Sequence, residues 1–391
     1  MIFGEKPFKV RVAAEKDKYY PVIFGKGIDS TFSQIAADII GDGREVRKDY
    51  SNVAIITDSN VKSLYESTLK QKLKARGISA LTLEIPAGEQ SKSFLMANKL
   101  IEELLENKFD RKSLLIALGG GVVGDLTGTV AMLLHRGVDY IQVPTTLLSQ
   151  VDSSIGFKVA VNTPQGKNVV GGFYPPTAVY SDSFSLVTLP QVQYNSGLGE
   201  VIKMAVSSDR KLFELIRKNI LMGSLNSKSI KENRDLARRC CDIKRKIVEI
   251  DPREENSFST RAVLNLGHTI GHALEVLSNY SDSALHGEMV SVGIVGAARI
   301  SYNRDILSEK GFRDIESLLS SADLSTRIPS ILAKHSNQEI IDLMKLDKKS
   351  EAGIIYMVLP ADIGRIHREE ARYKVEVKEE EVSRAFDYLR N

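Results

Sequence analysis

The sequence predicts two domains, an α/β domain with a parallel sheet over residues 1–185 and a mainly α-helical domain over residues 186–391. Three observations support this prediction. The length of 391 residues exceeds what one hydrophobic core usually serves. Apolar, strand-like runs alternate with helical patterns in the first half, and long amphipathic helical patterns dominate from about residue 190. Repeated β–α units form a parallel sheet, which binds ligands at the carboxyl ends of its strands.

The expected elements follow this division. In the first half, a strand pair is expected at the sheet edge, at residues 8–14 and 19–24. Further strands are expected at 53–57, 80–85, 113–118 and 140–143, and helices at 61–76, at 92–107 and after residue 119. In the second half, helices are expected at 196–220, 228–250, 262–278, 287–303, 306–320, 337–346 and 379–390, with a short strand at 353–359.

Composition excludes several classes of partner. Lys and Arg number 53 against 50 Asp and Glu, and a net charge of +3 is too small to indicate nucleic acid or a membrane surface. No apolar run is long enough for a membrane span, and the N-terminus lacks the apolar core of a signal peptide. The two cysteines, Cys240 and Cys241, are neighbours and poorly placed to staple a fold, so a reducing cytoplasm is expected.

Three of the six histidines fall within nineteen residues, and their spacing is typical of metal ligands. His268 and His272 are four apart, so they share one face of a helix, and His286 begins the next segment. The alternative is a pair of half-buried helix residues satisfied by backbone carbonyls. The glycines beside all three histidines favour a metal site over this alternative, because they let other groups come close to the histidine side chains.

A second motif, Gly119-Gly-Gly-Val-Val-Gly-Asp125, follows a strand and opens a helix. Glycines with the G-x-G-x-x-G spacing let backbone amides reach a pyrophosphate at a helix N-terminus, although tight turns also use glycine for steric reasons alone. A dinucleotide-binding fold of the Rossmann type has an acidic residue about 20 positions later that binds the ribose. Here that stretch offers only Asp139, so the ribose contacts could come from elsewhere, such as Asp58.

Three further stretches contain charged groups that suit an anionic substrate. Residues 150–158 and 166–168 interleave lysine and asparagine with glycine, which suits a phosphate or carboxylate, although an ordinary solvated loop would look similar. Glu200 and Lys203 lie one turn apart after two glycines, and the alternative there is a surface ion pair. Lys244 lies on a helix rich in solvated lysines, and its spacing alone does not select it.

Taken together, these motifs resemble the 3-dehydroquinate synthase family of sugar-phosphate cyclases, over about residues 53–368 and in the same order. The most specific segments are GGGVVGD (119–125), PTTLLSQVDSSIGFK (144–158), GKN (166–168), GEVIK (199–203), LNLGHTIGHALE (264–275), HGE (286–288) and DKK (347–349). The resemblance implies a phosphate-eliminating lyase of aromatic amino-acid biosynthesis. It converts 3-deoxy-arabino-heptulosonate 7-phosphate to 3-dehydroquinate by transient oxidation with NAD, β-elimination, re-reduction and intramolecular aldol closure.

The resemblance also implies the site residues. A divalent metal, zinc or cobalt, would be held by Glu200, His268 and His286. NAD would be bound by Asp58, Asn60, Glu89, Lys92, Gly120, Gly121, Val122, Asp125, Thr145, Thr146, Lys158 and Lys167. The substrate, a small phosphorylated sugar acid, would contact Lys158, Asn168, Lys244, Arg261, Asn265, His272, Lys348 and, from the neighbouring subunit of a homodimer, Arg136. Catalytic roles would fall to Asp152, Lys158, Lys203, Lys244 and His272.

The chain departs from the family pattern at Phe157, where glycine is usual, at Leu198-Gly199, and in a longer connection over 254–260. Phe157 could redirect Lys158 or narrow the pocket. Three other functions remain open: a related cyclase of the inosose or valiolone type, a metal-dependent NAD alcohol dehydrogenase, and a non-catalytic relative. The first is disfavoured by Lys244, Arg261, Asn265 and Lys348, and the second by the loop ending in Lys158.

Overall fold

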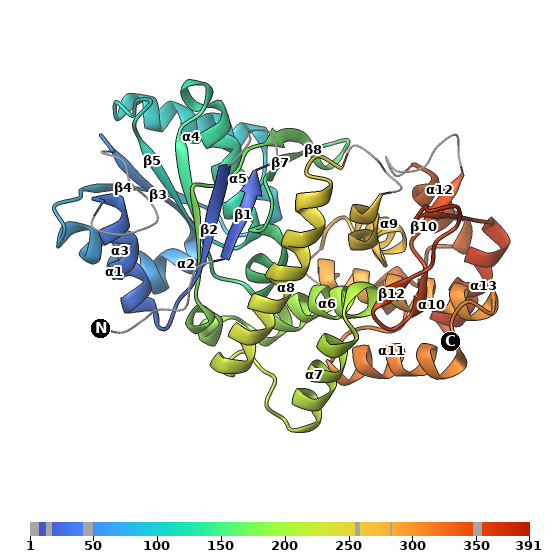
Figure 1. Ribbon diagram of the computed structural model, residues 1–391. Coiled ribbons are helices and arrows are strands. Elements are labelled where there is room, and N and C mark those ends of the chain that lie inside the picture. The colour runs from blue at the N-terminus through green and yellow to red at the C-terminus, as the bar shows by residue number, and fades with distance from the viewer. Residues whose placement is uncertain (1–7, 13–17, 42–49, 255–258, 282–283, 347–353) are drawn as a thin grey trace. The chain divides into compact units, whose positions relative to one another are not determined.

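The computed structural model describes residues 8–12, 18–41, 50–254, 259–281, 284–346 and 354–391. It divides into two compact units (Figure 1). The first contains residues 1–189 and 233–245, and the second contains 190–232 and 246–391. The predicted fold class, an α/β unit with a parallel sheet and a mainly helical unit, is confirmed. Within the described residues, no helix is both long and apolar enough to cross a membrane.

The first unit is built on a seven-stranded sheet with the order β1-β2-β9-β6-β5-β3-β4. All neighbours pair in parallel except β1 and β2. Its strands are β1 (Phe8–Val12), β2 (Lys18–Phe24), β3 (Val53–Asp58), β4 (Ala80–Ile85), β5 (Leu114–Gly119), β6 (Asp139–Pro144) and β9 (Ala178–Ser181). Its helices are α1 (Ile28–Ile39), α2 (Ser59–Val61), α3 (Ser67–Lys74), α4 (Phe94–Glu106) and α5 (Gly121–Leu133), with shorter turns η1 (Lys62–Glu66), η2 (Glu89–Ser91), η3 (Leu134–Arg136), η4 (Ser149–Ser153) and η5 (Ser183–Thr188).

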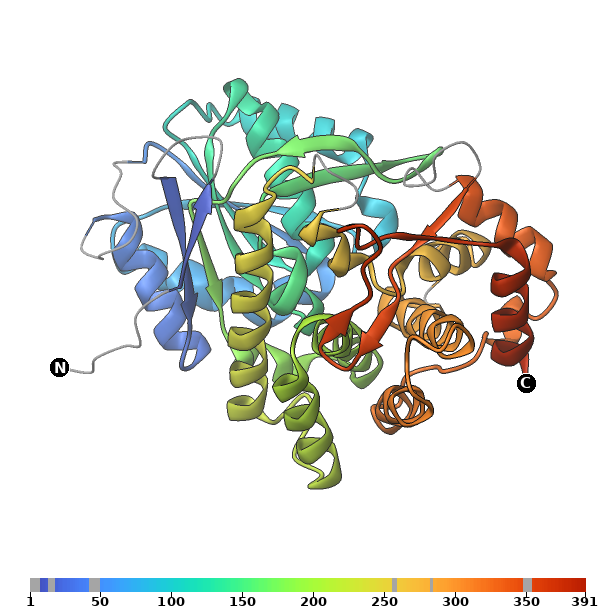
Figure 2. The same ribbon diagram turned by 45° about the vertical axis from the view of Figure 1, so that its right-hand side comes forward.

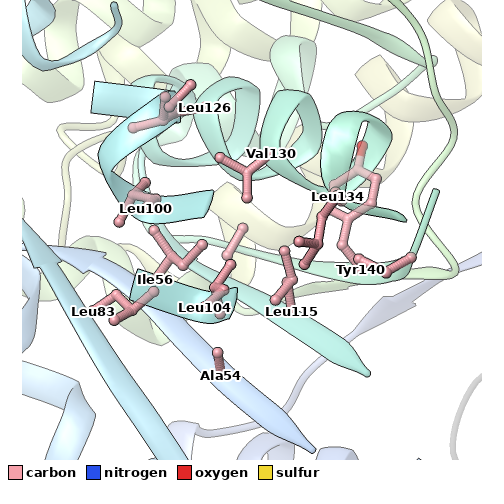
Figure 3. Close-up of a cluster of buried hydrophobic side chains, with 14 of the residues drawn as sticks. Ala54, Ile56, Leu83, Leu100, Leu104, Leu115, Leu126, Val130, Leu134 and Tyr140 are labelled. Carbon is pink, nitrogen blue, oxygen red and sulfur yellow. The ribbon is translucent and has the colours of Figure 1, made fainter. Parts of the chain in front are cut away.

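Both faces of this sheet are covered, which explains its continuous apolar strands. Side chains alternate along a strand, so Ala54 and Ile56 face one side of β3 while Val53 and Ile55 face the other. The first pair packs with Leu100 and other residues of α4 and α5 (Figure 3). The second pair packs with side chains of α1 and α3. Because helices cover both faces of the sheet, the carboxyl ends of its parallel strands are left as the edge where ligands bind.

A separate antiparallel hairpin, β7 (Lys158–Thr163) with β8 (Gly166–Phe173), replaces the polar loop expected from the sequence (Figure 2). Val159 and Val161 are buried in the core and anchor β7 beside α5. The ring of Phe157 is buried and contacts Phe173 edge to face, with centroids 6.2 Å apart. It therefore closes the base of the hairpin, while Lys158 stays exposed at the start of β7.

The second unit is mainly helical. Its helices are α6 (Gln191–Ser208), α7 (Arg210–Leu221), α9 (His268–Leu277), α10 (His286–Asn303), α11 (Glu309–Ser321), α12 (Asn337–Leu346) and α13 (Glu379–Arg390), with turns η6 (Thr260–Asn265) and η7 (Ser330–Leu332). Two small strand pairs complete it, β10 (Ile355–Met357) with β13 (Val375–Val377), and β11 (Pro360–Asp362) with β12 (Arg365–Ile366). The helix expected over 196–220 is two helices, because Asp209 leaves helical geometry and its side chain caps α7.

The limits of the two units differ from the predicted division at residues 185 and 186. The first unit runs to Leu189, and it also takes residues 233–245 from the middle of α8 (Ile230–Ile250). Cys241 packs there with Val22 and Val179 of the sheet. From the sequence, all of α8 was expected in the helical domain. An amphipathic pattern identifies the apolar face of a helix, but not the core into which that face packs.

Candidate functional site

The second unit brings together one carboxylate and two imidazoles. Glu200 is fully buried on α6, and His268 and His286 are the first residues of α9 and α10. Oε1 of Glu200 lies 3.8 Å from Nε2 of His268 and 3.4 Å from Nε2 of His286. The possible ligand atoms of the three residues all lie within 4.8 Å of one another.

The chemistry of these three groups fits a divalent metal. Nδ1 of His268 lies 3.2 Å from the carbonyl oxygen of Leu266, and Nδ1 of His286 lies 3.0 Å from Oε2 of Glu275. An oxygen that can only accept keeps a proton on each Nδ1, so in the neutral imidazole, the form that binds a metal, Nε2 carries the lone pair. Oε1 of Glu200 is buried and receives no regular hydrogen bond. Two imidazole nitrogens and one carboxylate oxygen form a ligand set that zinc uses when a fourth position stays open.

Glycines explain how three helices bring these side chains so close. A Cβ on Gly287 would lie 1.8 Å from the carbonyl oxygen of Ser196, and one on Gly199 would lie 2.6 Å from that of Gly287. α6 and α10 therefore touch through backbone, just beside Glu200 and His286. Gly267 has a φ of 78° before α9, and a Cβ there would meet the carbonyl of Val290. The glycines singled out in the sequence thus permit close helix packing.

The electrostatics of this cluster favour an ionised carboxylate. Lys203, one turn from Glu200, is itself buried and forms an ion pair with Oε2. Burial would raise the pKa of Glu200, but the charges of Lys203 and His286 hold it well below its usual range. Burial lowers the pKa of His286, yet the neighbouring carboxylates of Glu275 and Glu200 raise it overall. The surface ion pair considered from the sequence is a buried one.

Other predicted residues of the second unit lie around this centre. The ring of His272 lies one turn along α9, with its centroid 5.0 Å from that of His268. Arg261 is buried and donates to the backbone carbonyls of Asp251 and Pro252. Asn265 donates to Glu254 over 3.3 Å. Lys348, also predicted to contact substrate, lies outside the described residues.

In the first unit, predicted nucleotide-binding residues gather at the carboxyl ends of neighbouring strands. Asp58 ends β3, Glu89 follows β4, Gly120 follows β5, and Thr145 follows β6. Oδ1 of Asp58 accepts from the backbone amides of Asn60 and Val61, so it already caps α2. Glu89 accepts from Asn162 at 2.7 Å. This strand edge is where parallel sheets of this kind bind ligands.

The turn after β5 can admit a pyrophosphate. Gly120 caps α5, and a Cβ on it would lie 3.1 Å from Thr146, while one on Gly121 would lie 3.1 Å from Ser153. Bare backbone therefore lines the helix N-terminus, where Gly121 and Val122 occupy the first turn and offer amides to an anion. Oγ1 of Thr145 is buried beside this turn with no hydrogen-bond partner. The geometry fits the phosphate groups of a dinucleotide.

Two charged clusters complete the first unit. Nζ of Lys92 lies 2.5 Å from Oδ2 of Asp125 and donates over 2.5 Å to Oδ1 of Asn168. Burial raises the pKa of Asp125, and the charge of Lys92 opposes that rise. Nζ of Lys244 lies 2.9 Å from Oδ1 of Asp152 and donates to its carbonyl oxygen.

The remaining predicted residues lie at more open positions. Lys158 is exposed at the start of β7, Lys167 is half-buried on β8, and Arg136 follows α5 with a φ of 65°. One residue of the centre was missed altogether. Glu275 on α9 contacts His286. The sequence did not single it out, because a glutamate at this position of an amphipathic helix looks like an ordinary surface residue.

Several solved structures share this fold at low sequence identity. A 2-deoxy-scyllo-inosose synthase complexed with carbaglucose-6-phosphate, NAD+ and Co2+ aligns with a TM-score of 0.81 and 24% identity, over 98% of this chain and 99% of that one. The 2-epi-5-epi-valiolone synthase of Streptomyces hygroscopicus subsp. jinggangensis, with NAD+ and Zn2+ bound, aligns with a TM-score of 0.82 and 22% identity, over 97% and 99%. A glycerol dehydrogenase from Schizosaccharomyces pombe gives 0.63 and 12%, over 94% and 88%. The fold is therefore shared with these two synthases and with this dehydrogenase.

Sequence relatives narrow this class. A family model described as 3-dehydroquinate synthase N-terminal matches residues 82–196, and one described as 3-dehydroquinate synthase C-terminal matches residues 197–350. The 3-dehydroquinate synthase of Desulforamulus reducens is 44% identical over 315 residues, which cover 80% of this chain and 85% of the relative. That of Caldanaerobacter subterraneus subsp. tengcongensis is 40% identical over 368 residues, covering 94% and 96%. The chain belongs to the 3-dehydroquinate synthase family, as the sequence motifs predicted.

Proposed function

We propose that this chain converts 3-deoxy-arabino-heptulosonate 7-phosphate to 3-dehydroquinate and phosphate, as a carbon–oxygen lyase that depends on NAD and a divalent metal. The observation that carries the proposal is the centre formed by buried Glu200 with half-buried His268 and His286, within a chain 40–44% identical to curated 3-dehydroquinate synthases. Membership of the family identifies the expected substrate, and the three side chains of the centre are suited to hold the metal that the reaction needs.

The metal would be held by Glu200, His268 and His286. When bound, it would supply a Lewis acid beside the hydroxyl that is oxidised. Lys203 keeps Glu200 ionised and its Oε2 engaged, which leaves Oε1 for the metal. We assign the handling of protons near the reacting hydroxyls to Nζ of Lys203 and to the carboxylate of Asp152, which is paired with Lys244.

NAD would bind at the turn of Gly120, Gly121 and Val122. When bound, it would supply a hydride acceptor that is regenerated in each turnover. The helix N-terminus would neutralise the pyrophosphate, aided by Lys158 and Lys167. The residues assigned to the rest of the dinucleotide are Asp58, Asn60, Glu89, Lys92, Asp125, Thr145 and Thr146.

The substrate carries two anionic groups, and two sets of residues are assigned to them. The phosphate would be met by Lys158, Asn168, His272, Lys348 and Arg136 of a neighbouring subunit. The carboxylate would be met by Lys244, Arg261 and Asn265. A net charge of only +3 means that such local clusters, rather than the whole protein, have to attract the substrate. A cytoplasmic homodimer fits this proposal.

The test is incubation with the heptulosonate phosphate, catalytic NAD and zinc, with phosphate, dehydroquinate and NADH followed together. Equal release of phosphate and dehydroquinate without net NADH supports the proposal. Net NADH with no phosphate would instead indicate the alcohol dehydrogenase reaction. A product without a carboxylate, formed from another sugar phosphate, would indicate an inosose- or valiolone-type cyclase.

Variants of the centre test the metal assignment directly. Glu200→Ala and His286→Ala should each lose both the bound metal and turnover, because a two-ligand site holds zinc far more weakly. Metal content after gel filtration and product formation are measured on the same samples. Full activity in either variant would contradict the assignment.

A further inference from the structure

Glu275 lies on the same face of α9 as His268 and His272, at positions i, i+4 and i+7. Its side chain is almost fully buried, with 2% of the residue exposed. A carboxylate is rarely buried to this degree unless it is paired. The sequence position suggests an ordinary helix residue, so the reason for its burial has to come from its contacts.

Its contact with His286 has a direction. Oε2 of Glu275 lies 3.0 Å from Nδ1 of His286, and an ionised carboxylate only accepts hydrogen bonds. Nδ1 therefore donates, and the lone pair of the neutral ring lies on Nε2. That Nε2 is the atom 3.4 Å from Oε1 of Glu200. Glu275 thus presents His286 to the centre in the tautomer that a metal needs.

The backbone of Glu275 is anchored at the end of α9. Its carbonyl oxygen accepts from Oγ of Ser278 at 2.7 Å and from the amide of Tyr280 at 3.0 Å, at the point where α9 ends. His268 needs no such partner, because its Nδ1 is fixed by Leu266 two residues away. His286 begins a different helix, so its ring depends on a group from α9.

We propose that Glu275 is a positioning residue that holds the ring of His286 and thereby sets the affinity of the Glu200–His268–His286 centre for a divalent metal. The inference rests on the proposed function, since it concerns the same metal. Carboxylates behind a histidine ligand typically contribute about 10–100-fold to metal affinity. The hydrogen bond between Glu275 and His286 also links α9 to α10.

Another interpretation of these side chains exists. Ligand atoms of His272, Glu275 and His286 also lie within 4.8 Å of one another, so they form a second possible metal group. The hydrogen-bond distance between Glu275 and His286 favours the positioning role. The stoichiometry of binding separates the two interpretations.

The experiment measures Co²⁺ affinity by competition with a chelator, together with the visible absorption of the bound cobalt. Glu275→Ala should weaken binding about 10–100-fold and alter the cobalt spectrum. Glu275→Gln keeps an acceptor oxygen and should lose less. Glu288→Ala is the matched control, because Glu288 lies in the first turn of α10 but accepts from the amide of Ser325. Its affinity should stay within about threefold of the wild type.

The possible results are distinguishable. If wild-type protein binds no cobalt, the proposed function fails. If wild type binds one ion and both Glu275 variants bind it equally well, the positioning role is wrong while the proposed function stands. A merely structural role would lower thermal stability without metal and weaken NAD binding alongside cobalt binding, which also contradicts the proposal. Two ions per wild-type chain would favour the second metal group and overturn it.

Discussion

The two carboxylate oxygens of Glu200 have different partners, and this difference defines the centre. Oε2 pairs with the buried ammonium of Lys203, and Oε1 faces the two imidazoles. A buried carboxylate without a partner would take up a proton, but Lys203 keeps the pKa of Glu200 low. The carboxylate is therefore ionised at neutral pH and retains one oxygen for a cation.

Lys203→Met should destabilise the metal-free protein by roughly 3–5 kcal/mol, because it leaves the charge of Glu200 buried without its main counter-charge. Cobalt or zinc would replace that counter-charge, so the difference from wild type should shrink when metal is added. Thermal midpoints with and without metal measure both effects. The double variant Lys203→Met with Glu200→Gln should recover part of the lost stability. Equal midpoints for the metal-free wild type and the single variant would contradict this account.

Cys241 should be inert towards alkylating reagents in the folded protein. Burial raises the pKa of its thiol from 9.0 to about 12, and the charge of Lys244 opposes that rise only in part. The thiolate fraction at pH 8 is therefore about a thousandfold lower than in an unfolded chain. Mass spectrometry after iodoacetamide treatment, with and without guanidinium chloride, measures the labelling. Rapid modification of the folded protein at pH 8 would be the contrary result.

Individual site residues were predicted unevenly from the sequence. His268 and His286 stood out because glycines flank them and their spacing suits a metal. Glu200 was singled out beside Lys203, but its role as a metal ligand came from the family resemblance, since a carboxylate 68 residues before His268 has no spacing signal. Glu275 was missed for a physical reason. A glutamate on an amphipathic helix looks solvated until the packing of the next helix buries it.

At the scale of elements, backbone contact between α6 and α10 determines whether Glu200 and His286 can meet. Gly287→Ala should destabilise the second unit by about 2 kcal/mol or more, because its Cβ would meet the backbone oxygen of Ser196, which cannot move alone. We expect weaker metal binding as well. Thermal unfolding and chelator competition measure the two effects.

Gly296→Ala is a matched control on the same helix. Its Cβ would meet the ends of the Ile270 and Leu389 side chains, which can adjust. We therefore expect a smaller loss of stability and unchanged metal affinity. If the two variants behave alike, backbone contact at Gly287 is not what brings the helices together.

A second link between elements joins α10 to α13 through Arg304 and Glu381. Nε and one terminal nitrogen of Arg304 donate to the two oxygens of Glu381 at 2.6 and 2.7 Å. Glu381 also accepts from the amide of Lys378, which begins the helix. The hydrogen bonds from Arg304, followed by those at Lys378, lower the pKa of Glu381 below its ordinary 4.5, although partial burial opposes this.

Glu381→Gln should therefore cost about 1–2 kcal/mol of stability at pH 7. A depressed pKa in the folded state contributes stability that is complete above pH 4.5 and is lost as the pH falls through the folded-state value. The difference between wild type and variant should thus shrink towards pH 3. Thermal midpoints at pH 7 and pH 3 check this, and a difference that grows on acidification would contradict it.

The order of elements was largely predictable. The exceptions lack the hydrophobic periodicity that identifies a buried strand or an α-helix. Apolar runs identified the inner strands because both faces of the sheet are buried. The β7–β8 hairpin looked like a loop because β8 is exposed and glycine-rich, and only one side of β7 enters the core. The 61–76 helix contains a five-residue π segment, Lys62–Glu66, that no periodicity of 3.6 would reveal.

At the scale of the whole molecule, the chain returns to its first unit after leaving it. Residues 233–245 supply Cys241 to the core and Lys244 to Asp152, so a boundary in the sequence does not separate the two units cleanly. Lys244 was selected by resemblance among many helix lysines. Its pairing with Asp152, 92 residues away, depends on tertiary packing that the local sequence does not encode.

The proposed homodimer can be tested through Arg136, which the family resemblance assigns to the neighbouring subunit's site. Arg136→Ala and His286→Ala homodimers should each be nearly inactive, the first for lack of a phosphate contact and the second for lack of a metal ligand. A mixed dimer contains one intact site, in the Arg136→Ala subunit, which keeps its own His286 and receives Arg136 from its partner. Random assembly makes half of the dimers mixed, so about one quarter of wild-type activity should return.

Activity of separately purified, co-refolded and co-expressed variants checks this expectation, with dimer formation followed by analytical ultracentrifugation. Glu288→Ala mixed with His286→Ala is the control, because both variants keep Arg136 and their activities should simply average. If the Arg136→Ala and His286→Ala mixture merely averages its two inactive parents while forming dimers, Arg136 serves its own subunit and the shared site is wrong.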